Sequence, residues 1–162
     1  MLLRCEPVVA AIREASGEDK ETLVAALTPG GRTYDQQQAR ELAGLEHLVL
    51  VCGHYEGFDE RILHFVDREI SLGDYILSGG EIGAMAVADS IARLLPGNLK
   101  EGSAEEESFE SSLLEYPQYT RPADFEGLKV PEVLLQGDHG AVEKWRKEAA
   151  LQKTRERRPD LL

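Results

Sequence analysis

Two short apolar segments, each followed by a loop rich in glycine, constrain the fold of this chain more than any other feature. Segment 48–52 (LVLVC) leads into loop 53–57 (GHYEG), and segment 69–72 (EISL) leads into loop 73–80 (GDYILSGG). A short apolar run bounded by such breakers predicts a buried strand. Glycine lets main-chain groups approach a ligand closely, and ligands of open α/β sheets bind at the carboxyl ends of strands. The two loops therefore predict a ligand pocket at a sheet edge.

The remaining segments alternate between expected helices and strands. Further elements are a strand over 23–27 and helices over 6–15, 33–43, 59–65, 81–95 and 141–155, with Thr33 as the N-cap of the second helix. Strands that alternate with helices predict a parallel α/β sheet. Residues 81–95 are apolar almost all round, which is typical of a buried helix.

Length and composition exclude several classes of protein. The 162 residues suit one domain, or one domain with a small appendage. No apolar run is long enough to span a membrane, and the N-terminus, with Glu6, does not look like a signal peptide. Cys5 and Cys52 lie far apart and the four histidines lack ligand spacing, so we expect buried cysteines, no disulfide framework and no metal site. These features predict a cytoplasmic protein.

The charge of the chain is distributed unevenly. The net charge of the whole chain is −12. Residues 140–162 hold seven basic and four acidic residues, a balance of +3, so the preceding residues carry a net charge of −15. An acidic chain disfavours generic nucleic-acid affinity, because phosphate contacts come from Lys and Arg. The basic end is either a nucleic-acid-binding patch or an ordinary solvated helix face.

Ordered sequence motifs carry a resemblance to a known family. The P-loop and the G-x-G-x-x-G fingerprint are missing, so the expected pocket holds its ligand mainly by backbone. The motifs are LTPGGR at 27–32, CGHYEGFDER at 52–61, SLGDYILSGGE at 71–81, RLLPG at 93–97, SAEEESF at 103–109, YPQYTRP at 116–122, VPEVLLQGDH at 130–139 and RRPDLL at 157–162. In this order they resemble the bacterial TrmD-type tRNA (guanine-N1)-methyltransferases of the SPOUT class.

The resemblance implies a fold and an assembly. The expected fold is a SPOUT-type parallel α/β sheet with a deep C-terminal trefoil knot, plus a small helical C-terminal subdomain. Residues 1–99 would form the knotted S-adenosyl-L-methionine-binding domain, 100–115 an acidic flexible linker and 116–162 the tRNA-binding subdomain. The family also implies a homodimer with its active sites at the subunit interface.

Cofactor-binding residues are assigned from the same resemblance, by motif position. They are Leu27, Pro29, Gly53, Tyr55, Gly57, Leu72, Gly73, Tyr75, Leu77, Gly79 and Gly80. The three leucines could instead belong to the core. For tRNA we assign the basic residues of the last helix and its end, Lys144, Arg146, Lys147, Lys153, Arg155, Arg157 and Arg158, as phosphate partners.

The implied reaction transfers the methyl group of S-adenosylmethionine to N1 of the guanine at tRNA position 37. This nitrogen carries a proton, so a base must remove it. The family's base is an Asp whose position falls on Glu107, and the family's Arg, which stabilises negative charge on guanine O6, matches Arg93. Glu107 is one methylene longer than the usual Asp, and with Glu105 and Glu106 it could equally be part of a solvated acidic run.

Two further departures from the family leave other functions open. His54 stands where the family more often has Arg, and the family's chains normally begin well upstream of Met1. The alternative is therefore a knotted dimer that binds S-adenosylmethionine and tRNA without catalysis. A SPOUT-class methyltransferase for another RNA is a third possibility, which SAEEESF and YPQYTRP disfavour.

Overall fold

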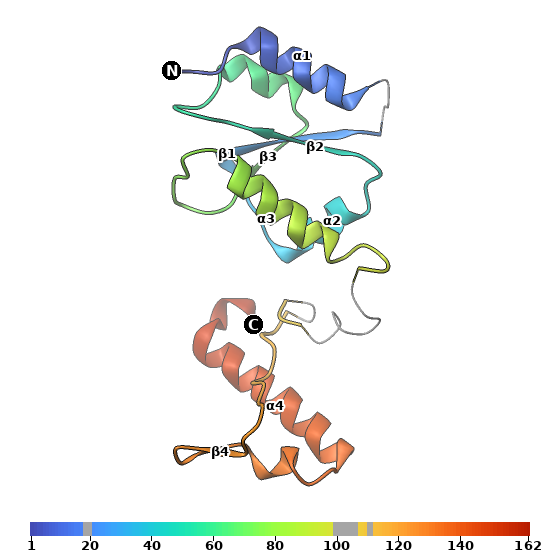
Figure 1. Ribbon diagram of the computed structural model, residues 1–162, viewed down its shortest axis with the longest axis vertical. Coiled ribbons are helices and arrows are strands. Elements are labelled where there is room, and N and C mark those ends of the chain that lie inside the picture. Colours follow the sequence, from blue (N-terminus) through green and yellow to red (C-terminus); the bar gives the residue numbers. More distant parts are fainter. Residues whose placement is uncertain (18–20, 99–106, 110–111) are drawn as a thin grey trace. The chain divides into compact units, whose positions relative to one another are not determined.

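A three-stranded parallel sheet organises the first part of the chain. Its strands are β1 (Leu23–Thr33), β2 (Leu48–Cys52) and β3 (Arg68–Ser71), and β1 pairs with both of the others. Figure 1 shows this sheet nearly edge-on, between helices. Ala25 of β1 lies opposite Leu50 on one side and Arg68 on the other. The predicted strands and the predicted parallel sheet are confirmed.

The computed structural model describes residues 1–17, 21–98, 107–109 and 112–162. The chain divides into two compact units, Met1–Leu99 and Lys100–Leu162, and each is described by itself. Much of the linker expected over 100–115 lies outside the described residues.

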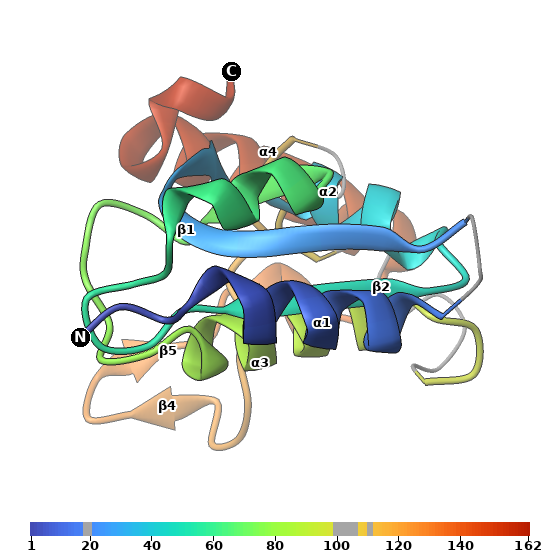
Figure 2. The same ribbon diagram turned by 90° about the horizontal axis from the view of Figure 1, so that it is seen from above.

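Helices cover both faces of the sheet in the first unit. Figure 1 shows α1 (Cys5–Ser16) on one face, with α2 (Gln36–Ala43) and α3 (Glu81–Ala92) on the other, and Figure 2 shows α1 running along β1 and β2. The short 3₁₀ helix η1 (Glu60–Phe65) contacts α1. Each helix confirms the expected type of element at its place, apart from η1, which is a tighter 3₁₀ turn.

Two apolar cores result, one on each side of the sheet. Successive residues of a strand point to opposite faces, so the neighbouring β1 residues Ala25 and Ala26, both completely buried, enter different cores. Buried residues of the first core are Val9, Ile12, Val24, Ala26, Val51 and Ile62; those of the second are Ala25, Leu42, Ile70 and Val87. Small residues in the middle strand let both layers pack closely.

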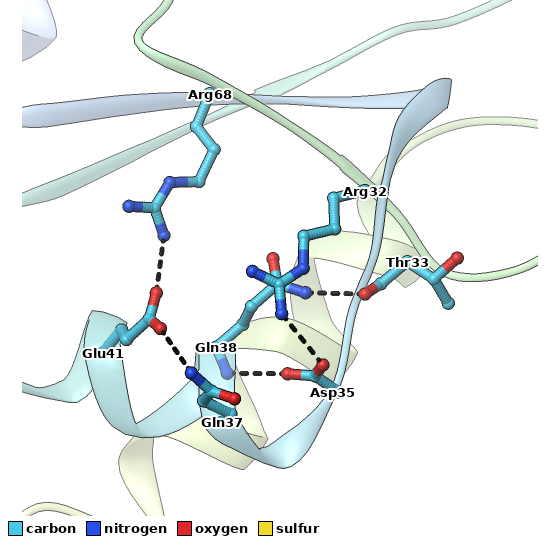
Figure 3. Close-up of polar contacts among 7 residues, drawn as sticks. All are labelled: Arg32, Thr33, Asp35, Gln37, Gln38, Glu41 and Arg68. Atoms are coloured by element: carbon cyan, nitrogen blue, oxygen red, sulfur yellow. Dashed lines mark hydrogen bonds and ion pairs between the residues drawn. The ribbon is translucent and has the colours of Figure 1, made fainter. Parts of the chain in front are cut away.

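Helix α2 begins later than predicted. Its N-cap is Asp35 and not Thr33, because the Asp35 carboxylate accepts a hydrogen bond from the Gln38 N–H at 2.8 Å. Thr33 instead ends β1, and its carbonyl accepts a 2.6 Å hydrogen bond from the buried Gln38 side chain (Figure 3). An ion pair of 3.3 Å between Arg68 and Glu41 also joins β3 to α2.

Helix α3 is not the buried helix that its apolar sequence predicts. Only Gly83 and Val87 of this helix are buried, whereas the side chains of Ile82 and Met85 are 63% and 70% exposed. The helix packs one side on the sheet and leaves apolar groups on its other side in contact with solvent. Apolar composition alone cannot tell whether this second side is covered by the same chain.

Strand β1 contains a register shift that brings its end close to β3. Leu27 and Arg32 both lie opposite Ile70, so residues 28–31 are extra to the pairing. At Gly31 a Cβ atom would lie 2.5 Å from the backbone carbonyl carbon of Glu69 and from the Ile70 nitrogen. Only a residue without a side chain fits there, since real Cβ atoms stay well beyond that distance.

The second unit is built around one long helix. Helix α4 (His139–Arg157) has Asp138 as its N-cap, and the Asp138 carboxylate accepts a hydrogen bond from the Ala141 N–H at 3.1 Å. The helix buries Ala150 and Thr154. It confirms the predicted last helix. A hairpin that the sequence analysis did not predict joins β4 (Asp124–Phe125) to β5 (Leu128–Lys129). Short 3₁₀ helices precede and follow α4, namely η2 (Glu132–Leu134) and η3 (Pro159–Leu161).

We predict that Gly31→Ala destabilises the first unit by about 1–3 kcal/mol or more, because the added methyl group overlaps the β3 backbone, which cannot rotate away. Gly30→Ala is the matched control: its added Cβ would stay 3.9 Å from its nearest neighbours. We expect that change to stay within about 0.5 kcal/mol. Urea unfolding measures both free energies, and an equal loss in the two variants would contradict the close approach at Gly31.

Candidate functional site

The loops that follow β1, β2 and β3 surround one cavity of about 310 Å³. They meet at the carboxyl edge of the sheet, where open α/β sheets bind ligands. All the residues assigned above to cofactor binding line this cavity: Leu27, Pro29, Gly53, Tyr55, Gly57, Leu72, Gly73, Tyr75, Leu77, Gly79 and Gly80. The structure thus brings together residues from three separate motifs.

The first loop is the extra segment of β1. Thr28 lines the cavity, and its hydroxyl donates a 2.8 Å hydrogen bond to the Glu69 carboxylate on β3. Glu69 therefore fixes the direction in which the loop leaves the sheet. Sequence reasoning missed this pair, because its two members are far apart in the chain and their pairing follows from the register shift.

The second loop is a tight turn held by its own histidine. The Gly57 N–H donates to the His54 carbonyl at 3.0 Å, and the Tyr55 N–H lies 3.1 Å from Nδ1 of His54. Tyr55 adopts a φ of 60°, which is uncommon for a residue with a side chain. The rings of His54 and Tyr55 are 4.7 Å apart between centroids. His54 thus shapes the turn that presents Tyr55 to the cavity.

The turn continues into a rigid start of η1. Asp59 caps this helix, accepting from the Arg61 N–H at 3.0 Å, and its carboxylate also lies 2.6 Å from the Arg61 guanidinium. These hydrogen bonds lower the pKa of Asp59 to about 2. The pair therefore stays ionised throughout the neutral pH range.

The third loop returns across the second. The Gly80 N–H donates to the Gly53 carbonyl at 2.8 Å, and His54 and Gly79 form an antiparallel bridge. A Cβ at Gly80 would lie 2.9 Å from the Cα atom of Cys52, so the backbones nearly touch. Here glycine is required for contact between two parts of the protein, in addition to any room it leaves for a ligand.

Cys52 and Glu81 form a polar pair beside this contact. Burial raises the pKa of the Cys52 thiol, and the Glu81 carboxylate raises it further. The thiol therefore stays protonated near neutral pH and offers no reactive thiolate. Both cysteines are free and half-buried, whereas we had expected full burial. Glu81 also lies 3.7 Å from Nε2 of His54, a contact that the sequence analysis did not foresee.

The two residues assigned to catalysis belong to different units. Arg93 is exposed and forms the C-cap of α3. Glu107 is half-buried in the second unit. Both have contacts within the protein. Their neighbours Glu105 and Glu106, in the expected acidic run, lie outside the described residues.

The basic residues assigned to tRNA fall into three groups in the structure. Lys144 and Lys147 form ion pairs of 3.9 and 2.7 Å with Glu148 and Glu143. Three others have a partner within the unit: Arg146 lies over the Tyr116 ring, Lys153 donates to the Glu115 carbonyl, and Arg158 pairs with Asp160. Arg155 and Arg157 are exposed and form no ion pair with the described residues. These two cations can therefore bind an added phosphate without breaking an ion pair to a described residue.

A second cavity, of about 450 Å³, lies between α4 and the segment that precedes it. Three aromatic residues (Tyr116, Tyr119 and Trp145) and two arginines (Arg121 and Arg146) contribute to its wall. None of the described residues that line it is acidic, although the chain carries thirty acidic residues. Aromatic rings beside arginine favour a planar, anionic group such as a nucleotide.

The fold and the glycine-lined cavity define a class of α/β protein that binds a ligand mainly through backbone groups at a sheet edge. The chain belongs to the TrmD family: a family profile described as tRNA (Guanine-1)-methyltransferase TrmD matches residues 1–162. The first resemblance, drawn from motifs alone, is thereby confirmed.

Individual relatives agree with the family match. A tRNA (guanine-N(1)-)-methyltransferase of Halalkalibacterium halodurans is 54% identical over 165 residues, which cover 100% of this chain and 67% of the relative. The corresponding protein of Listeria innocua is 54% identical, with 100% and 68% covered. That of Metamycoplasma arthritidis is 53% identical, with 100% and 70% covered. In the part of the chain that the structure describes, no helix is long and apolar enough to cross a membrane.

Proposed function

We propose that this chain is a tRNA (guanine(37)-N1)-methyltransferase that uses S-adenosylmethionine. The observation that carries the proposal is the single cavity lined by every residue assigned to the cofactor, in a chain that belongs to the TrmD family. Family membership supports the catalytic function over the non-catalytic dimer. A tRNA substrate also favours the cytoplasm as the place where the protein works.

The cavity suits S-adenosylmethionine in size and in chemistry. Its volume of about 310 Å³ falls at the lower end of the range for small-molecule sites. Backbone amides and carbonyls of three glycine loops can bind the polar edges of adenine and ribose, while Leu27, Leu72 and Leu77 offer apolar surface. When bound, the cofactor supplies a methyl group on a positively charged sulfur.

Glu107 and Arg93 divide the work at the guanine. The carboxylate of Glu107 would accept the proton from N1, which leaves the nitrogen lone pair free to take up a methyl group. The negative charge that then develops on O6 is stabilised by the guanidinium of Arg93. Each role needs a charged side chain that is accessible to a tRNA in solution, and Arg93 is exposed.

The third loop supports the proposed trefoil knot. Residues 72–80 leave β3, and the loop then returns to bond Gly53 in the second loop before α3 begins. A knot requires one loop to pass through another, and this hydrogen bond brings the third loop into contact with the second. The knot would also hold the cavity wall in place against opening.

Exposed apolar side chains support the proposed homodimer. Ile82 and Met85 lie three residues apart on α3, and therefore on one side of the helix. Beside the cavity, Tyr55, Tyr75 and Ile76 are 65%, 56% and 81% exposed. A surface of this kind next to a ligand cavity is typical of a protein interface. A second copy that covers it would complete the wall of the active site.

We predict that the chain transfers methyl groups to a tRNA with guanine at position 37 and hardly at all to the same tRNA with adenine there. Arg93→Ala should reduce the transfer rate by about 10²- to 10³-fold, because it removes stabilisation of the charge on O6. Arg13→Ala, which changes an arginine in the last turn of α1, is the matched control and should have little effect.

Radiolabelled S-adenosylmethionine measures both rates. Equal labelling of the two tRNAs would contradict the proposed function. Binding of S-adenosylmethionine by calorimetry, with no turnover at any enzyme concentration, would instead favour the non-catalytic dimer.

We predict a dimer in solution that Met85→Glu converts to monomers, because the substitution places a charge in an apolar interface. Leu128→Glu is the matched control: this leucine of the hairpin is 75% exposed and lies outside the proposed interface. Light scattering coupled to size exclusion gives the masses. A monomeric parent chain, or monomers from both variants, would argue against an interface at α3.

We predict that tRNA binding weakens with added salt, and that Arg155→Ala with Arg157→Ala lowers the slope of log affinity against log salt by about 2. The double change Lys144→Ala with Lys147→Ala is the control and should lower it less, because these lysines already pair with Glu148 and Glu143. Filter binding at several salt concentrations measures both slopes. Affinity that does not depend on salt would exclude α4 as a phosphate-binding surface.

A further inference from the structure

The segment that carries Glu107 is closed on itself by hydrogen bonds. The Phe109 N–H donates to the Leu113 carbonyl at 2.8 Å, and the Glu115 N–H donates to the Ser108 hydroxyl oxygen at 2.9 Å. Ser108 is the residue next to Glu107. The place of the Glu107 backbone therefore depends on where Glu115 is held.

Helix α4 holds the far end of this segment at two consecutive positions. The Leu114 N–H donates to the Thr154 hydroxyl oxygen at 2.9 Å, and the Lys153 ammonium donates to the Glu115 carbonyl at 2.8 Å. Thr154 is completely buried, and its own hydroxyl proton is donated to the Ala150 carbonyl at 2.7 Å. This last bond fixes the hydroxyl so that its lone pair faces Leu114.

A third contact comes from the end of α4. The Arg158 guanidinium lies 5.8 Å from the centre of the Phe109 ring, and a 2.7 Å ion pair with Asp160 holds this guanidinium in place. Phe109 is two residues from Glu107. The segment that carries Glu107 is therefore contacted at Phe109 and at Leu114 and Glu115. All of these contacts come from one turn of α4 and from Arg158, which follows the helix.

We propose that Thr154 and Lys153 are positioning residues for Glu107, a proposal that rests on the methyltransferase function above. They act on the base through the bonds from Leu114 and Glu115 to Ser108, and they touch neither the guanine nor the cofactor. A flexible Glu side chain gains most from a fixed backbone, because an error of about 1 Å in a catalytic group can cost about 10²-fold in rate. Lys153 then serves the base and is no longer a phosphate partner.

The test compares Thr154→Val, which keeps the shape but removes the acceptor for Leu114, with Thr154→Ser, which keeps the hydroxyl. We expect Thr154→Val to slow single-turnover methyl transfer at least about tenfold, with the KM for tRNA and the affinity for S-adenosylmethionine changed less than about twofold. Thr154→Ser should restore most of the rate. Gln152→Ala, a change at an exposed neighbour on α4, should leave the rate unchanged.

Amide hydrogen exchange of the peptide 107–116 measures how firmly this segment is held. We expect exchange to be faster in Thr154→Val than in the parent chain, and unchanged in Thr154→Ser and Gln152→Ala. Faster exchange with an unchanged methylation rate overturns the positioning role, as does a loss confined to tRNA affinity. Should Thr154→Val fail to fold, Lys153→Met carries the same expectations, with Lys153→Arg as the rescue. A parent chain without methyl transfer overturns the proposed function and this inference together, whereas a defect confined to the variants concerns the inference alone.

Discussion

The hydrogen bond from the Gly80 amide to the Gly53 carbonyl is the contact on which the cavity depends. It ties the loop after β3 to the loop after β2, and it needs glycine at position 80, because a Cβ atom there would lie 2.9 Å from the Cα atom of Cys52. With these loops joined, α3 starts at a fixed place beside the sheet. Its buried side then includes Gly83 and Val87, and Ile82 and Met85 on the helix are exposed.

The second unit reconciles an acidic protein with an RNA substrate. Most of the positive charge near the end of the chain is already engaged, either in pairs along α4 or in contacts that hold the preceding segment. Arg155 and Arg157 are exposed and have no ion-pair partner among the described residues, and the cavity of this unit has no acidic residue in its described lining. Repulsion from the rest of the chain would discourage other modes of binding and favour this surface.

The sequence predicted local features well and long-range ones poorly. Strand 48–52 and helix 6–15 were correct because breakers and periodicity lie within the segment itself. The cap of α2 was wrong because Thr33 and Asp35 are both good caps, and the extension of β1 through Thr33 decides between them. The Thr28–Glu69 bond could not be found, since it depends on the register shift of β1.

Predicting the candidate site depended on the motifs, not on periodicity. Every cofactor residue assigned from them lines one cavity, but His54 and Glu81 approach each other only because the third loop folds back, which no local pattern encodes. The exposure of α3 was predicted wrongly for a related reason. A helix that is apolar on all sides has the same sequence pattern whether its second side is buried by the same chain or by another molecule.

The attachment of Leu114 and Glu115 to α4 has a consequence for how such a protein can change over time. The helix that presents Arg155 and Arg157 also holds the segment next to Glu107, so under the proposed function a single helix would serve both tRNA binding and the position of the base. A change at an exposed position such as Gln152 would leave this segment in place, whereas a change at the buried Thr154 would release it.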